Sequence, residues 1–233
     1  MITDVADEVG TLVQSIDYTL TGELNVDISP NVWVTCNLKW ARVGKIVIDP
    51  VTGNSFTILE ILENEGLILE ALPTNPTNEP AGNMLYLPYP FYLSGTKIAA
   101  NSEWSKVSNS LMAKTPVVWL LELIRFKSYG RESTIDFESD LRLFFLDETN
   151  VTQFYTSDHR SNVVSPMTEL ASEFINTIGS LRQFKTVDQY EIITFSRFGV
   201  EQDQGVFKNI LDANLSGVEL RLTLTKYKQN CKC

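Results

Sequence analysis

The chain has 233 residues, of which 43% are hydrophobic and 21% are charged, so it has the composition of a folded protein with one large core or two small ones. Its formal net charge is −10, which argues against tight binding to nucleic acid phosphates but allows DNA to pass beside it without adhering. The longest apolar stretch, residues 116–124, is too short to span a bilayer, and "MITDVADEVG" lacks the features of a secretion signal. Three cysteines without a paired framework indicate a reducing compartment.

The first 72 residues predict a helix followed by a small β-rich domain. Apolar residues at helical spacing form one face of the helix, and Thr3 is its candidate cap: Ile2, Val5, Val9, Leu12, Val13 and Ile16. Alternating residues from Val26 to Leu38 predict strands, and three more short strands are expected between Val43 and Leu72, with turns at 49–54 and 63–66. Because residues 56–62 are apolar on both faces, a small barrel or sandwich is favoured over an open sheet.

Residues 73–93 contain five prolines within "PTNPTNEPAGNMLYLPYP" and show little periodicity. Prolines keep such a segment extended, while its tyrosines and leucines make it too apolar for a free linker. We therefore predict an ordered arm between two domains, 1–72 and 94–233. Its aromatic side chains are candidate interface residues: Tyr86, Tyr89 and Phe91.

The pattern of residues 94–233 is that of mixed helices and strands. A helix with Ser102 as its cap would place Trp104, Val107 and Leu111 on one face, and "PVVWLLELIRF" has the composition of a buried strand. Residues 135–145 and 218–224 alternate as strands around an amphipathic helix at 162–181. The fold class predicted is α+β: a small N-terminal barrel-like or sandwich-like domain, then a mixed sheet packed with one or two long helices.

Three sets of residues carry chemically active groups. His159 follows Ser157 and Asp158, but consecutive residues cannot aim at one another as a catalytic triad, so a polar loop is favoured. Asp136, Glu138 and Asp140 share one strand face; they would suit a divalent cation or a glycosidic bond, but the solvated face of an amphipathic strand is the favoured interpretation. Cys231, Cys233 and the distant Cys36 lack the spacing of a zinc site. We predict no catalytic residue, metal or cofactor.

Four blocks resemble virion proteins of tailed bacteriophages, of the tail-completion or neck type: "TPVVWLLELIRF", "LRLFFLDE", "FSRFGV" and "LSGVELRLTLTKY". Their order, with a long helix between the second and third, covers residues 94–227. The resemblance implies a non-enzymatic α+β domain that assembles into a ring, a hexamer or dodecamer, between capsid and tail. Residues 20–72 depart from the tail-terminator pattern and look more like the small barrels of head-completion or stopper proteins.

The resemblance implies contacts with other neck, tail or portal proteins, DNA passing through the ring, no membrane partner, and a place in the virion after assembly in the host cytoplasm. The alternatives left open are a tail hub, baseplate or portal-proximal ring component, an enzyme built on the three carboxyls, and a cellular two-domain binding protein. Near the end of the chain, the acidic loop before the final strand is the other candidate interface: Gln202, Asp203, Gln204 and Gly205.

Overall fold

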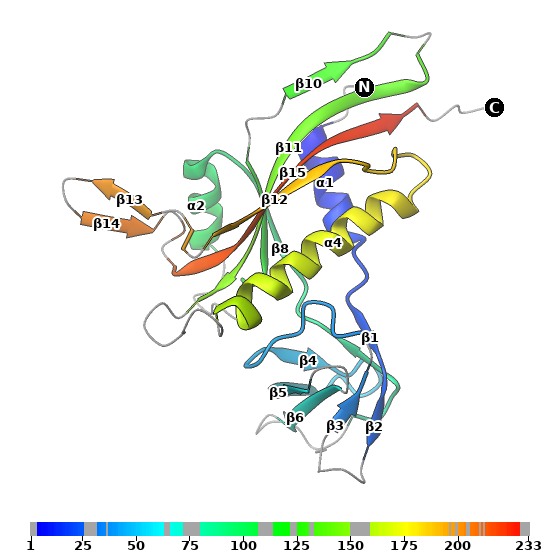
Figure 1. The fold of residues 1–233 in the computed structure, drawn as a ribbon, viewed down its shortest axis with the longest axis vertical. Coiled ribbons are helices and arrows are strands. Elements are labelled where there is room, and N and C mark those ends of the chain that lie inside the picture. Colours follow the sequence, from blue (N-terminus) through cyan, green and yellow to red (C-terminus); the bar gives the residue numbers. More distant parts are fainter. Residues whose placement is uncertain are drawn as a thin grey trace. The chain divides into compact units, whose positions relative to one another are not determined.

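The computed structural model describes residues 4–25, 32–35, 37–62, 66–71, 80–106, 114–121, 125–130, 133–149, 159–195, 197–198, 200–203, 206–209, 211 and 213–228. The chain divides into two compact units (Figure 1). One, the β unit, is Asp17–Tyr89; the other, the α+β unit, combines Met1–Ile16 with Pro90–Cys233. Each unit is built on its own sheet, and the expected α+β class with a barrel-like small sheet is confirmed.

The β unit is a sheet of seven short strands in which every pair is antiparallel. The strands are β1 (Thr19–Thr21), β2 (Glu23–Asn25), β3 (Val32–Val34), β4 (Ile46–Ile48), β5 (Ser55–Leu62), β6 (Gly66–Ala71) and β7 (Met84–Tyr86), and their order in the sheet is β1-β7-β4-β5-β6-β3-β2. β1 and β2 thus occupy the two ends of the order although only Gly22 separates them in the chain. The sheet must therefore curl until its two ends meet at Gly22, as a barrel requires.

Packing explains why a glycine stands at this junction. A Cβ on Gly22 would lie 2.3 Å from the carbonyl oxygen of Val34 and 2.5 Å from the Trp33 indole nitrogen. Apolar side chains from the curled sheet fill its interior: Leu20, Trp33, Val47, Phe56, Ile58, Leu67, Leu69 and Leu85. The predicted meander of three strands between Val43 and Leu72 is confirmed as β4, β5 and β6.

The predicted turn at 49–54 is organised by Asp49, whose side chain is fully buried. Its carboxylate accepts hydrogen bonds from the backbone N–H of Val51 and Ala81 at 2.8 Å and from the Thr52 hydroxyl at 2.9 Å. Burial alone would raise the pKa of Asp49, but these donors outweigh it and hold the pKa below its ordinary value. Asp49 thereby attaches the segment before β7 to the β4–β5 turn.

The described residues of the α+β unit form one mixed sheet of six strands and a separate two-stranded hairpin. The strands are β8 (Phe91–Gly95), β9 (Val117–Leu121), β10 (Arg125–Ser128), β11 (Ile135–Glu148), β12 (Tyr190–Phe195), β13 (Val200–Asp203), β14 (Val206–Asn209) and β15 (Leu215–Tyr227). The sheet order is β12-β15-β11-β9-β8, with β10 paired to β11. Among the strand pairs of the described residues, only β8 and β9 run parallel, and the helix α2 (Lys97–Lys106) lies between them in the chain.

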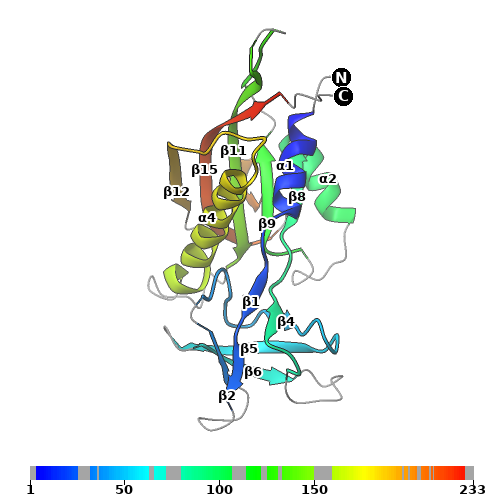
Figure 2. The ribbon, with the colours of Figure 1, turned by 90° about the vertical axis from the view of Figure 1, so that its right-hand side faces the viewer.

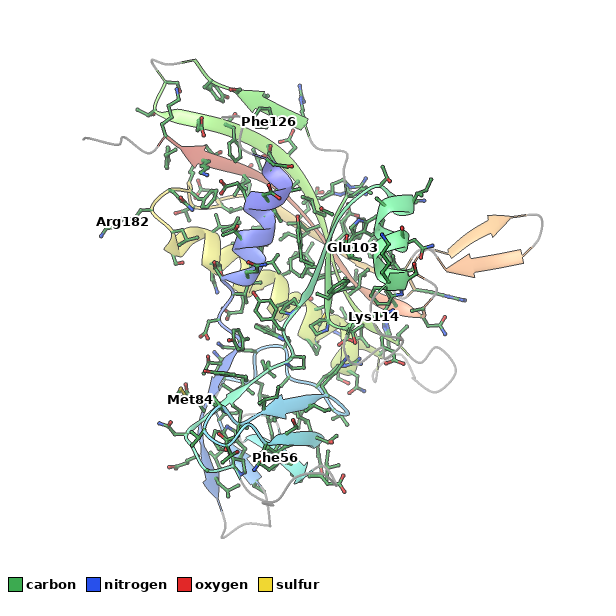
Figure 3. The ribbon with its side chains drawn as sticks, turned by 180° about the vertical axis from the view of Figure 1, so that it is seen from behind. Phe56, Met84, Glu103, Lys114, Phe126 and Arg182 are labelled. Atoms are coloured by element: carbon green, nitrogen blue, oxygen red, sulfur yellow. The ribbon has the colours of Figure 1, made fainter. Side chains whose placement is uncertain are left out.

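Helices cover both faces of this sheet. On one face, α1 (Val5–Gln14) packs against β8 and β9, and α4 (Ser165–Ser180), which continues the π-helical turn η2 (Arg160–Val164), packs against β11 and β15 (Figure 2). The predicted inner stripe of α4 is fully buried: Met167, Leu170, Phe174 and Ile178. On the other face, Ala100 and Trp104 of α2 join a cluster with Trp119, Phe144 and Leu146. Lys114 donates to the Trp104 carbonyl at 2.8 Å and lies over its ring, beside α2 in Figure 3.

The N-terminal helix α1 belongs to the α+β unit, whereas the sequence placed it with the small β-rich domain. Its predicted apolar face is buried there: Val5, Val9, Leu12, Val13 and Ile16. Tyr92 of β8 donates from its hydroxyl to the Ala6 carbonyl at 2.8 Å, and Lys226 of β15 pairs with Glu8. An amphipathic stripe shows that a helix packs against something, but not against which sheet.

Other local expectations differ from the structure. Asp4 caps α1 by accepting the Ala6 N–H at 2.9 Å, while Thr3 and Ile2 lie outside the described residues. The second helix begins at Lys97, with Ala99 N–H donating to the Thr96 hydroxyl at 3.3 Å, so the expectation that Ser102 caps it is wrong. Ser102 lies inside the helix, and the expected Val107 and Leu111 lie outside the described residues.

Two predicted segments, the buried strand "PVVWLLELIRF" and the arm 73–93, each contribute to two different elements of the structure. Within "PVVWLLELIRF", Val117–Leu121 is buried as β9, but Arg125 begins a separate, exposed strand. In the arm 73–93, β7 joins the sheet of the β unit and β8 joins that of the α+β unit, because both segments have unpaired backbone groups that a neighbouring strand satisfies. Residues 73–79 lie outside the described residues.

This arrangement makes the β unit an insertion within the α+β unit, which predicts an asymmetry between two truncations. A chain in which a short Gly/Ser linker joins Ile16 to Pro90 should fold and unfold cooperatively, since α1 stays in place. A chain starting at Pro90 should not, because it loses the buried Val9, Leu12 and Val13, each contributing about 1.5–3 kcal/mol. Thermal unfolding followed by circular dichroism checks both; equal stability of the two chains would contradict the grouping of α1.

Candidate interaction surfaces

The hairpin of β13 and β14 is a sheet by itself. Val200–Asp203 pairs antiparallel with Val206–Asn209, and no third strand pairs with either among the described residues. In Figures 1 and 3 the hairpin extends away from the six-stranded sheet. The predicted interface residues Gln202 and Asp203 lie in β13, whereas Gln204 and Gly205 lie outside the described residues.

Core residues anchor the hairpin on both sides. Before it, Phe198 is 7% exposed and packs edge-on against Trp119 with ring centroids 5.7 Å apart, and its N–H donates to the Leu215 carbonyl at 2.7 Å. After it, Leu211 is buried in the same cluster beneath α2. The hairpin therefore leaves the unit from two fixed points on a packed core, and this is the geometry of a contact element held on a rigid frame.

A second surface is formed by tyrosines of the β unit. Tyr18 makes edge-to-face contacts with Tyr86 and Tyr89, at centroid distances of 4.9 and 5.4 Å. Tyr89 is 43% exposed, and burial of the rest of its ring, with the nearby Tyr18, raises its pKa. The third predicted aromatic, Phe91, is partly buried in β8 and packs toward Trp104 at 6.4 Å, within the core of the α+β unit.

A row of charged side chains crosses β11, β15 and β12. Glu219 is 2% exposed, and its Oε1 lies 2.6 Å from Nε of Arg142 and 2.6 Å from Nε of Arg221. Arg221 also donates from Nη2 to Oε2 at 3.2 Å and lies 3.6 Å from Glu191. A shallow depression of about 580 Å³ lies beside this row and also includes Asp140. The carboxylates of Asp140 and Glu191 balance the two guanidiniums in its lining, so the depression offers no surplus positive charge to a polyanion.

The row has a pH-dependent effect on stability. Burial alone would raise the pKa of Glu219, but hydrogen bonds from Arg221 and Arg142 outweigh it and lower that pKa below its ordinary value. Because the folded pKa lies below the unfolded one, this stabilisation is complete above about pH 4.3 and is lost as pH falls through the folded pKa.

Replacing Glu219 with glutamine should therefore lower the free energy of unfolding at neutral pH by about 1–3 kcal/mol, since two partly exposed guanidiniums lose their carboxylate partner. The difference from the natural protein should shrink as the solution is acidified below the ordinary glutamate pKa. Urea titrations at several pH values measure it. A difference that stays constant down to strongly acidic pH would contradict the assigned role of the charged row.

Two of the three carboxyls of the predicted β11 set have separate protein partners. Glu138 accepts a hydrogen bond from the Tyr129 hydroxyl at 2.5 Å, which raises the pKa of Tyr129, and Asp140 accepts one from the Thr223 hydroxyl at 2.8 Å. Asp136 lies opposite Tyr129, whose N–H donates to its backbone carbonyl at 3.1 Å. Within the described ranges, no group of three or more His, Cys, Asp or Glu side chains is placed to hold a metal ion.

His159 bonds to a residue far along the chain. Its Nε2 lies 2.6 Å from the hydroxyl oxygen of Ser216, and Ser216 is fully buried. The contact joins the residue before η2 to the start of β15 and so helps to place α4 on the sheet. Ser157 and Asp158 lie outside the described residues. The three cysteines considered as zinc ligands also lie outside them: Cys36, Cys231 and Cys233.

Sequence reasoning missed the charged row and the Ser216 contact. Glu219 and Arg221 are visible as alternating charges on one strand, but Arg142 joins them only through the register that pairs Phe144 with Glu219. His159 and Ser216 are 57 residues apart. Neither partnership leaves a local signal in the sequence.

Comparison with known proteins adds no family to these observations. No protein-family model matches the chain, and neither the curated proteins nor the solved structures contain a match to it. None of the helices in the described part of the chain is both long and apolar enough to cross a membrane.

Proposed function

We propose that this chain is a structural subunit of a tailed-bacteriophage virion: a ring-forming head–tail connector of the neck or tail-completion type. It would join the portal region of the capsid to the tail and let DNA pass. The observation that carries the proposal is the β13–β14 hairpin, which is anchored at Phe198 and Leu211 and pairs with no other described strand of its own chain. The block order from "TPVVWLLELIRF" to "LSGVELRLTLTKY" supports the same class by resemblance.

A ring subunit needs two different contact surfaces, because head-to-tail contacts close a ring when each copy presents one surface to the next. A hairpin on a packed frame suits one of them. The net charge of −10 is compatible with a channel wall that DNA does not adhere to. In this proposal the subunit forms a hexamer or dodecamer with portal, neck or tail proteins as neighbours, assembles in the host cytoplasm, and has no catalytic activity, metal or cofactor.

Excising the hairpin tests the proposal. A variant in which a two-glycine turn replaces Val200–Asn209 keeps both anchors, Phe198 and Leu211, and should remain folded. It should fail to complement phage whose own gene is deleted, and capsids and tails should accumulate unjoined in electron micrographs. Normal yields of infectious particles from the excised variant would overturn the proposal.

A triple variant with Asp136→Asn, Glu138→Gln and Asp140→Asn serves as the matched control. It removes three carboxyls, one exposed and two half-buried, from another part of the same unit but leaves the hairpin intact, so particles should assemble normally. A metal-dependent hydrolytic activity that is lost in this variant would instead support an enzyme built on β11.

A further inference from the structure

The strand β12 is an open edge of the six-stranded sheet. It pairs with β15 on one side, and no described strand pairs with it on the other. Its sequence, "YEIITF", contains β-branched and aromatic residues but neither the proline nor the lysine that commonly block strand addition. By contrast, the exposed β10 carries Arg125 and Lys127. β12 therefore presents a row of backbone donors and acceptors that an incoming strand can satisfy.

A groove runs beside this edge. It has a volume of about 570 Å³ and lies between β12 and the η2–α4 segment. Ile192, Thr194 and Phe195 line it from the strand, and Val164 and Thr168 line it from the helical side. A strand added to β12 would direct alternate side chains into this groove, because successive side chains point to opposite faces of a sheet. An open strand edge beside a helix is an arrangement that binds extended segments by strand addition.

The β13–β14 hairpin indicates which strand would pair with the β12 edge. A lone two-stranded hairpin is marginally stable in water, so β13 and β14 gain from pairing with a further strand. They cannot turn back onto their own β12, because Phe198 enters the core beneath α2 between the two elements and the hairpin extends away from the sheet (Figure 1). A strand that pairs with β12 therefore comes from outside this hairpin, and a second copy of the chain offers a hairpin that would gain from the pairing.

We infer that the β13–β14 hairpin of one copy adds as a strand to the β12 edge of a second copy, beside the groove between β12 and η2–α4. The contact joins two different surfaces, so it repeats from copy to copy and closes into a ring when the rotation permits. This inference rests on the proposed function and names the receiving surface of the ring contact.

Disulfide crosslinking tests which surfaces meet. The natural cysteines are first removed by Cys36→Ser, Cys231→Ser and Cys233→Ser. One tagged chain then carries Thr194→Cys on the exposed edge. A differently tagged chain carries either Glu201→Cys or Gln202→Cys, which are adjacent positions in β13. Oxidation of the mixture should give heterodimers with one of the two hairpin cysteines, because a disulfide requires Cα atoms within about 7 Å. Ser128→Cys, on the exposed β10, replaces Thr194→Cys as the control and should give none.

Blocking the edge tests the same contact by a separate route. Thr194 is exposed, so Thr194→Lys should leave the melting temperature unchanged, but the added charge should oppose strand pairing and reduce the ring fraction in size-exclusion chromatography at least tenfold. Ser128→Lys should leave that fraction unchanged. Rings that persist with Thr194→Lys, or equal crosslinking at Ser128, would overturn the inference and leave the ring proposal standing. Monomers alone, for the natural chain in isolation and in virion extracts, would overturn both.

Discussion

Replacing Gly217 with valine should prevent the α+β unit from folding. Gly217 has a φ of +151°, a backbone conformation that side chains with a Cβ rarely adopt. A Cβ built there lies 2.0 Å from the carbonyl oxygen of Phe145, and backbone atoms of the neighbouring strand cannot move aside without breaking the β11–β15 ladder. We expect a loss of at least about 4 kcal/mol, seen as the absence of a cooperative thermal transition.

Gly130→Ala is the matched control. Nothing lies within 4 Å of a Cβ at Gly130, so this change should leave the thermal midpoint almost unchanged. If the Gly217 variant melts at the temperature of the natural protein, the close approach of β15 to β11 is not present in solution.

Leu222→Asp should have the second largest effect. Leu222 is 6% exposed and faces the helical side of the sheet, opposite Leu141 of β11. Burying an unpaired carboxylate there would cost several kcal/mol or force the strand out of the sheet. We expect insoluble protein, or soluble protein that lacks the near-ultraviolet circular dichroism of packed aromatic residues.

Leu222→Met separates charge from shape at the same position. It conserves volume and apolarity, so it should cost less than about 1.5 kcal/mol and leave the near-ultraviolet signal intact. Equal behaviour of the aspartate and methionine variants would mean that Leu222 is not part of a packed core.

The elements with strong periodicity were predictable from the sequence. The inner stripe of α4 and the alternation of β15 are confirmed, since Val218, Leu220 and Leu224 are fully buried. The curled sheet of the β unit was also predictable, because apolar residues on both faces of a strand require cover on both sides.

What was not predictable depends on contacts between distant segments. Nothing local in Val5–Gln14 shows that it packs on β8 and β9, which begin more than 70 residues later. The meeting of β1 and β2 at Gly22 follows from the whole strand order, and the charged row around Glu219 follows from the register of β11 with β15. At 201–205 the sequence indicated an acidic loop, while in the structure Val200–Asp203 pairs with Val206–Asn209 as a hairpin, because cross-strand pairing is not a local property.

The most direct test of the ring proposal is native mass spectrometry of the purified 233-residue chain, with negative-stain images of the same sample. The proposal predicts a single closed oligomer of six or twelve copies, seen as a ring with a central opening, which is lost when Val200–Asn209 is excised. A chain that stays monomeric at all concentrations and also fails to join rings in virion extract would contradict it.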